Sequence, residues 1–278
     1  MNVLEFTLLI WLGAVAAGFL GALTGLGGGV VIVPLLALVF GVDIRYAIGT
    51  SLVSVIATSS GAAAAYVKEG FTNIRIGMFL ELATTFGALG GAFLATHISG
   101  SSVAIVFGVV LLASAYLSGR RRSEPSLSGQ SDALAVRLRL NGTVPTPDGL
   151  QSYHVRHTVL GFGIMVVAGV LSGLLGIGSG AFKVLAMDQA MRIPFKVSTT
   201  TSNFMIGVTA AASAGIYLDR GYIDPGLVMP VLLGVLLGAL LGARVLRGAH
   251  PQSLRIVFIC VIAVLGIEMI YKGLTGKL

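Results

Sequence analysis

The chain has 278 residues, of which 55% are hydrophobic and only 10% are charged, and its formal net charge is +7. A soluble domain carries about 25% charged residues, so this composition excludes an ordinary water-soluble globule. Lys and Arg lie mainly in the joints between apolar runs and have no interleaved aromatic residues, which excludes a nucleic-acid-binding protein and is typical of membrane-protein loops.

The first half of the chain contains five apolar runs, which lie at residues 6–23, 30–40, 47–67, 76–98 and 103–118. Most approach the roughly 20 residues that a helix needs to cross hydrocarbon, whereas the second is short. A membrane barrel would instead show segments of about 10 residues with alternating polarity. We therefore predict an all-α integral membrane protein, and we take the first run as a retained span rather than a signal peptide.

A polar stretch at residues 119–157 interrupts the apolar runs. It is rich in Arg, Ser, Pro, Gly and Asp, a composition typical of a linker. We predict a cytoplasmic linker here, with a first membrane repeat at residues 1–118 and a second at 158–278.

The second half repeats the pattern, with apolar runs at residues 158–175, 181–191, 197–218, 226–246 and 254–274. Its second run is again short. The single cysteine, Cys260, is expected to be a small buried hydrophobic residue. One cysteine can form neither a disulfide framework nor a cysteine-based metal site.

The two halves are copies of one unit. A shift of about 151 positions aligns residues 18–92 with 169–243 without a gap, and about 20 of roughly 75 positions are identical. Five crossings is an odd number, so the second copy must be inserted upside down, as in many secondary transporters. With the N-terminus outside, the cytoplasmic joints collect about 13 basic residues and the outer joints about 4. If the short runs were re-entrant hairpins, the best split would be about 11 to 6, so we prefer ten crossings.

A glycine-rich stretch precedes each short run. Gly27, Gly28 and Gly29 correspond to Gly178, Ser179 and Gly180. Clustered glycine breaks a helix or lets backbones approach closely, and backbone freed inside a membrane must be buried or line a watery cavity. Since the short runs span less than about 20 Å, the stretches are expected to dip inward and meet near the bilayer centre.

The helix N-termini expected at the glycine stretches suggest a ligand, because a helix N-terminus presents unpaired N–H groups that favour an anion. The alternative is plain close packing of helices through small residues. A Rossmann or P-loop interpretation fails, because no strand precedes the glycines and no suitably placed Lys-Ser/Thr follows.

Hydroxyl-rich segments open the third run of each half. Thr50 and Ser51 in the first half correspond to Thr201 and Ser202, which Asn203 follows. Such residues often cap helices, but this number exceeds what capping needs. We predict that these five side chains line a substrate site.

Two of the charged residues inside the apolar runs are candidates for function. Lys183 follows Gly180 by three residues and has no charged counterpart in the first half, so it could neutralise an anion, pair with Asp188 or snorkel to the interface. Glu81 is a candidate for proton coupling or for pairing with Lys183; the alternative is a structural ion pair or a place near the membrane face.

The remaining titratable groups offer no catalytic arrangement. The four histidines lack the spacing of metal ligands, and no nucleophile, base and orienter set is evident. We expect no metal, no cofactor and no enzymatic activity.

The glycine motif GALTGLGGGVVIVPLL at residues 21–36, AIGTSL at 47–52 and the second copy GLLGIGSGAFKVL at 173–185 resemble the sulfite exporter TauE/SafE family, also called the toluene sulfonate uptake permease family. The resemblance covers nearly the whole chain apart from the linker. It implies transport of sulfite, organosulfonates or other small sulfur-containing anions. Ser179 replaces a glycine and Leu185 stands where Pro34 lies in the first half, which leaves the choice of anion open.

The sequence thus predicts a multi-pass cell-membrane transporter that moves a small anion by alternating access, with a proton or cation as coupling ion. The alternatives are an anion channel and a carrier for a non-sulfur organic anion.

Overall fold

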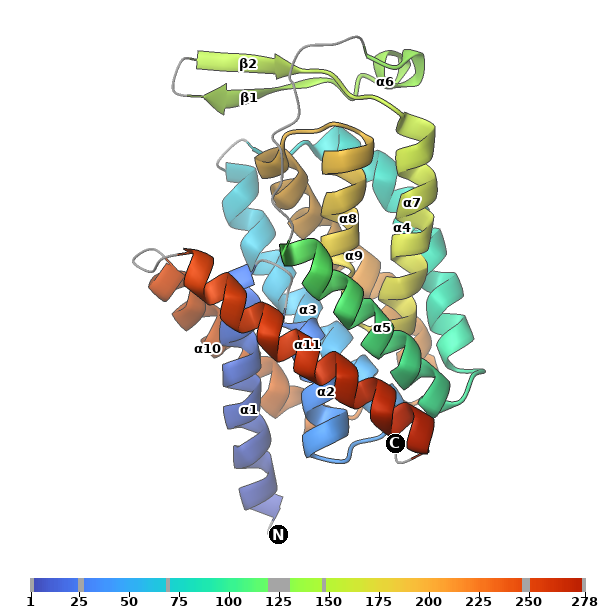
Figure 1. Cartoon of the computed structure of the whole chain (residues 1–278), viewed down its shortest axis with the longest axis vertical. Helices are drawn as coiled ribbons and strands as arrows, with labels where there is room; N and C mark the ends of the chain where they lie inside the picture. The colour runs from blue at the N-terminus through green and yellow to red at the C-terminus, as the bar shows by residue number, and fades with distance from the viewer. Residues whose placement is uncertain are drawn as a thin grey trace.

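The computed structural model describes residues 3–24, 28–68, 71–119, 131–146, 149–246 and 251–276. Helices dominate it, and the described strands form one small two-stranded sheet. Figure 1 shows a bundle with the N-terminus at one end and the sheet at the other. The prediction of an all-α membrane architecture is confirmed.

The helices of the first half follow the predicted apolar runs. Their bounds are α1 Val3–Thr24, α2 Gly29–Pro34, the π-helical segment η1 Leu35–Val39, α3 Ile44–Lys68, α4 Ile74–Ala95 and α5 Gly100–Gly119.

The second half has the same order of long and short elements. Its bounds are α7 Thr158–Leu175, α8 Gly180–Leu185, the π-helical segment η2 Ala186–Ala190, α9 Phe195–Asp219, α10 Pro225–Leu246 and α11 Pro251–Thr275. The short second segment of each half is therefore a six-residue α-helix that continues directly into a π-helix. Within the described residues, α1, α4, α5, α7 and α10 are long and apolar enough to cross a membrane.

The linker is folded where the structure describes it, which the sequence did not predict. Helix α6 (Ala133–Arg137) precedes an antiparallel hairpin of β1 (Gly142–Thr146) and β2 (Gly149–Tyr153). We call residues 131–157 the linker cap and the end of the molecule that it covers the linker face (Figure 1).

Hydrogen bonds attach the linker cap to the helices beneath it, and two of them involve the starts of α7 and α4. The carboxylate of Asp132 accepts from the backbone N–H of Thr158 at 3.1 Å, and this bond lowers the pKa of Asp132. The Nδ2 of Asn73 donates to the Tyr153 hydroxyl at 2.6 Å. Burial raises the pKa of the Tyr153 phenol, which keeps it a neutral acceptor. The cap therefore connects the starts of α4 and α7.

Equivalent helices make equivalent contacts in the two halves of the chain. The most extensive helix–helix contacts are those of α1 with α10 and of α4 with α7. By the repeat, α1 corresponds to α7 and α4 to α10, so the two pairs are counterparts of each other. Gly18 of α1 lies against the backbone of Val235, and its counterpart Gly169 of α7 lies against the backbone of Thr84. Because Val235 and Thr84 are also counterparts, the same glycine makes the same close approach in both halves.

The counterpart helices run in opposite directions. In Figure 1, α1 rises from the N-terminal end, whereas α7 descends from the linker face, and α5 and α11 likewise run against each other. Helices α3 and α9 contact each other extensively between the two halves. This arrangement indicates the inverted repeat that the odd number of segments predicts.

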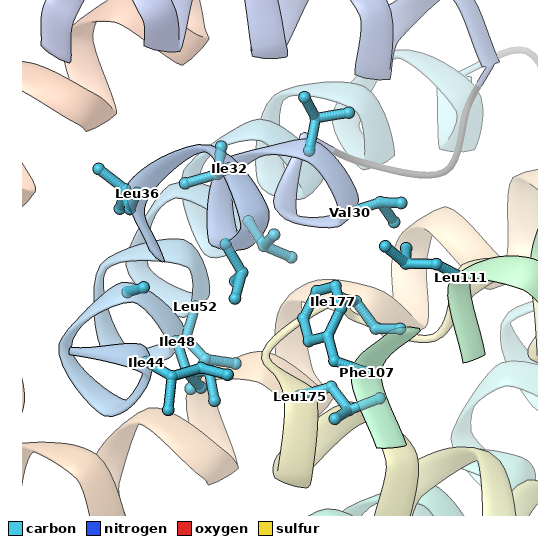
Figure 2. Close-up of a cluster of buried hydrophobic side chains, with 14 of the residues drawn as sticks. Val30, Ile32, Leu36, Ile44, Ile48, Leu52, Phe107, Leu111, Leu175 and Ile177 are labelled. Carbon is cyan, nitrogen blue, oxygen red and sulfur yellow. The ribbon is translucent and has the colours of Figure 1, made fainter. Parts of the chain in front are cut away.

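The short segment of the first half lies in the larger apolar core. Figure 2 shows Ile32 and Leu36 facing Ile48 and Leu52 of α3, with Ile177 of the second glycine stretch close by. All five side chains are buried. The expectation that Cys260 is buried is wrong, because its side chain is exposed on α11.

Candidate functional site

Lys183 lies on α8, the short α-helix of the second half. Its side chain is fully buried, and its Nζ donates a hydrogen bond to the hydroxyl of Thr209 on α9 at 2.5 Å. A buried ammonium costs several kcal/mol unless a partner compensates it. The partner of this ammonium is a hydroxyl, so the negative charge that balances it must lie beyond Thr209.

That negative charge belongs to Glu81 of α4. Thr209 Oγ1 lies 2.7 Å from Glu81 Oε1. Thr209 Oγ1 also lies 3.0 Å from the backbone oxygen of Met205 in its own helix. A hydroxyl has one proton to give, and the shorter contact, to a carboxylate, is the stronger one, so Thr209 accepts from Lys183 and donates to Glu81. The three side chains form a continuous cation–hydroxyl–carboxylate chain across α8, α9 and α4, which we call the charge relay.

Hydroxyls from α4 complete the surroundings of Glu81. Thr85 donates to Glu81 Oε1 at 3.3 Å, and the hydroxyl of Thr84 lies 3.4 Å from that of Thr209. The other carboxylate oxygen, Oε2, is buried and has no hydrogen-bond partner within the described residues. Such an oxygen can take up a proton without breaking an existing bond.

The charge relay joins the two halves, and the positions related to it by the repeat do not form a second one. By the repeat, Lys183 corresponds to Ile32 and Glu81 to Leu232. The threonine is present twice, but Thr58 donates to the backbone oxygen of Ser54 in its own helix. The two copies of the repeat therefore differ in the charged residues at these positions.

The two glycine stretches meet beside the charge relay's helices. A methyl group added to Gly29 would lie 2.7 Å from Ser51 Oγ and 2.9 Å from the backbone oxygen of Gly176. Gly176 and Gly178 both have positive φ, 68° and 69°, which favours glycine. The prediction that the stretches approach each other thus agrees with the described residues, whereas Gly27 lies outside them.

The neighbouring members of the predicted site are buried around the same loops. Gly28 accepts the first hydrogen bonds of α2, from Val31 at 3.1 Å. Ser179 takes a left-handed conformation with φ 47° at the start of α8, and its hydroxyl is buried without a described partner. Gly180 lies against Ile206 of α9.

The hydroxyl residues predicted from sequence divide into three environments. Ser51 donates to the backbone oxygen of Gly176 at 2.8 Å, and Ser202 donates to that of Gly180 at 3.3 Å. These two serines hold the glycine stretches.

The other three lie apart from these loops or lack a described bond. Thr201 accepts from the backbone N–H of Asn73 at 3.1 Å, toward the linker face. Thr50 is fully buried, and its hydroxyl has no described partner. Asn203 is buried as well. That these side chains surround Lys183 and bind substrate remains a prediction.

Sequence reasoning missed Thr209 as part of the site. Its signal was present, because it is one of the repeat-identical positions and lies seven residues, about two helical turns, after Ser202. Thr84 had no such signal. Among the described residues, no group of three His, Cys, Asp or Glu side chains is placed to hold a metal ion.

A family description, "Sulfite exporter TauE/SafE", matches residues 10–269. The chain belongs to the sulfite exporter TauE/SafE family. Like other chains of this family it is a multi-pass membrane transporter, which confirms the resemblance found in the glycine motifs.

Curated relatives of this TauE/SafE chain carry the description of probable membrane transporter proteins. The "Probable membrane transporter protein YunE" of Bacillus subtilis is 28% identical over 281 residues, covering 98% of this chain and 99% of the relative. The "Probable membrane transporter protein MJ0441" of Methanocaldococcus jannaschii is 24% identical over 267 residues, covering 91% of both. No solved structure matches the chain.

Proposed function

We propose that this TauE/SafE chain is a secondary transporter that carries a small sulfur-containing anion, such as sulfite or an organosulfonate, across the cytoplasmic membrane by alternating access. The charge relay is the observation that supports this most. A fully buried lysine bound to a neutral hydroxyl is a cation that an anion can neutralise.

Glu81 makes the anion affinity of this site depend on a proton. While Glu81 is ionised, the charge relay is electrically neutral and a further negative charge in the membrane interior is costly. Once Oε2 takes up a proton, Lys183 is left with an uncompensated charge that favours an anion. Anion and proton would therefore bind together, and the proton is the coupling ion of this proposal.

Two structural features favour a carrier over an anion channel. The two halves are related by inversion, an arrangement that allows alternating access by rocking one unit against the other. The charge relay is buried between α4, α8 and α9. A carrier for a non-sulfur organic anion stands as the second candidate, because a carboxylate would satisfy the same cation.

The test is uptake by purified protein in proteoliposomes under an imposed pH gradient. The panel comprises radiolabelled sulfite, sulfate, sulfoacetate, taurine and two carboxylates. Saturable uptake of one sulfur-containing anion, lost in Lys183→Met, supports the proposal. Uptake of the carboxylates alone would assign the second candidate, and equal uptake by Lys183→Met would remove the lysine from the site.

A further inference from the structure

The linker face carries a cluster that joins α9 to the start of α4. Lys196 Nζ lies 3.6 Å from the centroid of the Phe71 ring, and the backbone N–H of Asn73 donates to Thr201 Oγ1 at 3.1 Å. The Asn73 side chain also caps α4 by accepting from Ile76. We call Lys196, Phe71, Asn73 and Thr201 the linker-face gate.

The opposite face carries the repeat counterpart of this cluster. Counting back or forward by the repeat, Lys196 corresponds to Arg45, Phe71 to Tyr222, Asn73 to Asp224 and Thr201 to Thr50. Both clusters contain a cation–aromatic pair, since Arg45 Cζ lies 5.7 Å from the centroid of the Tyr222 ring. We call Arg45, Tyr222, Asp224 and Thr50 the opposite gate.

The two gates are not in the same state. The threonine of the linker-face gate holds its hydrogen bond, whereas Thr50 is fully buried and its hydroxyl has no described partner. A buried hydroxyl without a partner costs free energy, so its retention calls for a second state in which it is satisfied.

We infer that the two gates are alternating latches, and that Thr50 accepts a hydrogen bond from the backbone N–H of Asp224 in the conformation in which Thr201 has released Asn73. Inverted repeats produce two mirror-related conformations when the halves exchange their local geometries. The conformation described here then has the linker-face latch formed. This inference rests on the proposed alternating access and assigns it two positioning residues, Thr201 and Thr50.

A pocket lies next to the linker-face latch. It has a volume of about 290 Å³ and is lined by Phe71, Thr72, Asn73, Arg75 and Tyr153 among others. Ile74, the first residue of α4, also lines this pocket. Glu81 of the charge relay lies seven residues further along the helix, which corresponds to about 10 Å. Separation of α9 from the start of α4 would extend this pocket toward the charge relay.

The test uses matched variants of the two threonines and matched reporters. Thr201→Val and Thr50→Val remove one hydroxyl each at almost constant shape. Ser198→Cys and Ala47→Cys, which are repeat counterparts and fully buried, report opening at the linker face and the opposite face. The background is Cys260→Ser, since Cys260 is exposed. The protein is held in nanodiscs and the rate of alkylation by N-ethylmaleimide is measured.

Thr201→Val should raise alkylation of Ser198→Cys about fivefold and lower that of Ala47→Cys, the effect of losing one hydrogen bond in a two-state equilibrium. Thr50→Val should shift both reporters the other way. Thr201→Ser, which keeps the hydroxyl, should leave the alkylation rates within about twofold of those of the parent. Shifts of the same sign in both valine variants, or no shift in a monodisperse protein, would overturn the latches.

The alkylation measurement needs no transported anion, so it tests the latches independently of the proposed function. A reciprocal shift without uptake of any anion of the panel would refute the substrate assignment alone. Normal anion uptake without a reciprocal shift would refute the latches alone.

Discussion

The ammonium of Lys183 and the carboxylate of Glu81 are joined through a single hydroxyl, that of Thr209. The distances are 2.5 Å from Lys183 Nζ to Thr209 Oγ1 and 2.7 Å from Thr209 Oγ1 to Glu81 Oε1. A direct ion pair would hold both charges firmly, whereas a bridging hydroxyl leaves each charge able to find another partner. This is a suitable arrangement for a site that binds and releases an anion.

Replacing Lys183 by Met should abolish anion uptake and also destabilise the protein. The substitution leaves Glu81 buried without a compensating charge, which costs about 3 kcal/mol when one partner of a buried pair is removed. The double variant Lys183→Met with Glu81→Gln should regain the thermal midpoint of the parent but not its uptake. Equal destabilisation of the single and double variants, measured by thermal unfolding in detergent, would mean that the two charges do not compensate each other.

Glu81→Gln should separate anion binding from the proton. The amide cannot be ionised, so a protonated Lys183 has no ionised partner in this variant. Uptake by the parent is expected to rise as the outside of the vesicle is acidified, whereas anion binding by Glu81→Gln should no longer strengthen between pH 6 and pH 5. A pH dependence that persists in Glu81→Gln would place the coupling proton on another group.

Thr209→Val should weaken transport much more than the repeat-equivalent Thr58→Val. Thr209 bridges two charges, and a hydrogen bond to a charged group contributes about 1.5–3 kcal/mol, so uptake should fall at least tenfold. Thr58 only donates to backbone oxygens of its own helix at 3.0 and 3.2 Å. Initial uptake rates at equal protein amounts check this, and similar losses in both variants would argue for a general packing role.

Gly29→Ala should lower the thermal midpoint and the yield of folded protein. The added methyl group would collide with Ser51 Oγ and with the backbone oxygen of Gly176, which cannot move aside cheaply. Gly61→Ala on α3 is the control, because nothing lies within 4 Å of the added atom and alanine favours the helix by about 1 kcal/mol. If both variants unfold at the temperature of the parent, the glycine stretches are not packed as described.

Much of the architecture could be predicted because the membrane leaves few choices. The apolar runs, the gap-free repeat and the odd number of segments together require two helical repeats with inverted orientation in the membrane. Lys183 and Glu81 were found from sequence for a related reason, since charges within apolar runs need partners. Their pairing was one of the predicted alternatives, but the bridging hydroxyl of Thr209 was not predicted, because a threonine in a helix usually bonds to its own backbone, as Thr58 does.

The features that sequence reasoning missed depend on contacts between distant residues. The hairpin of the linker cap has no apolar alternation, and Tyr153 of β2 instead meets Asn73 near the start of α4. Cys260 was predicted to be buried, but the apolar stretch of α11 around it gives no periodic signal to separate lipid-facing from protein-facing positions.

Counterflow tests the central claim most directly. Proteoliposomes loaded with the unlabelled anion that the uptake panel identifies are diluted into a trace of the same labelled anion, with the membrane potential clamped at zero. A carrier that alternates between two faces should accumulate label transiently above its equilibrium level, and Lys183→Met should not. Label that rises only to equilibrium, without an overshoot in the parent protein, would contradict alternating access and indicate an anion channel.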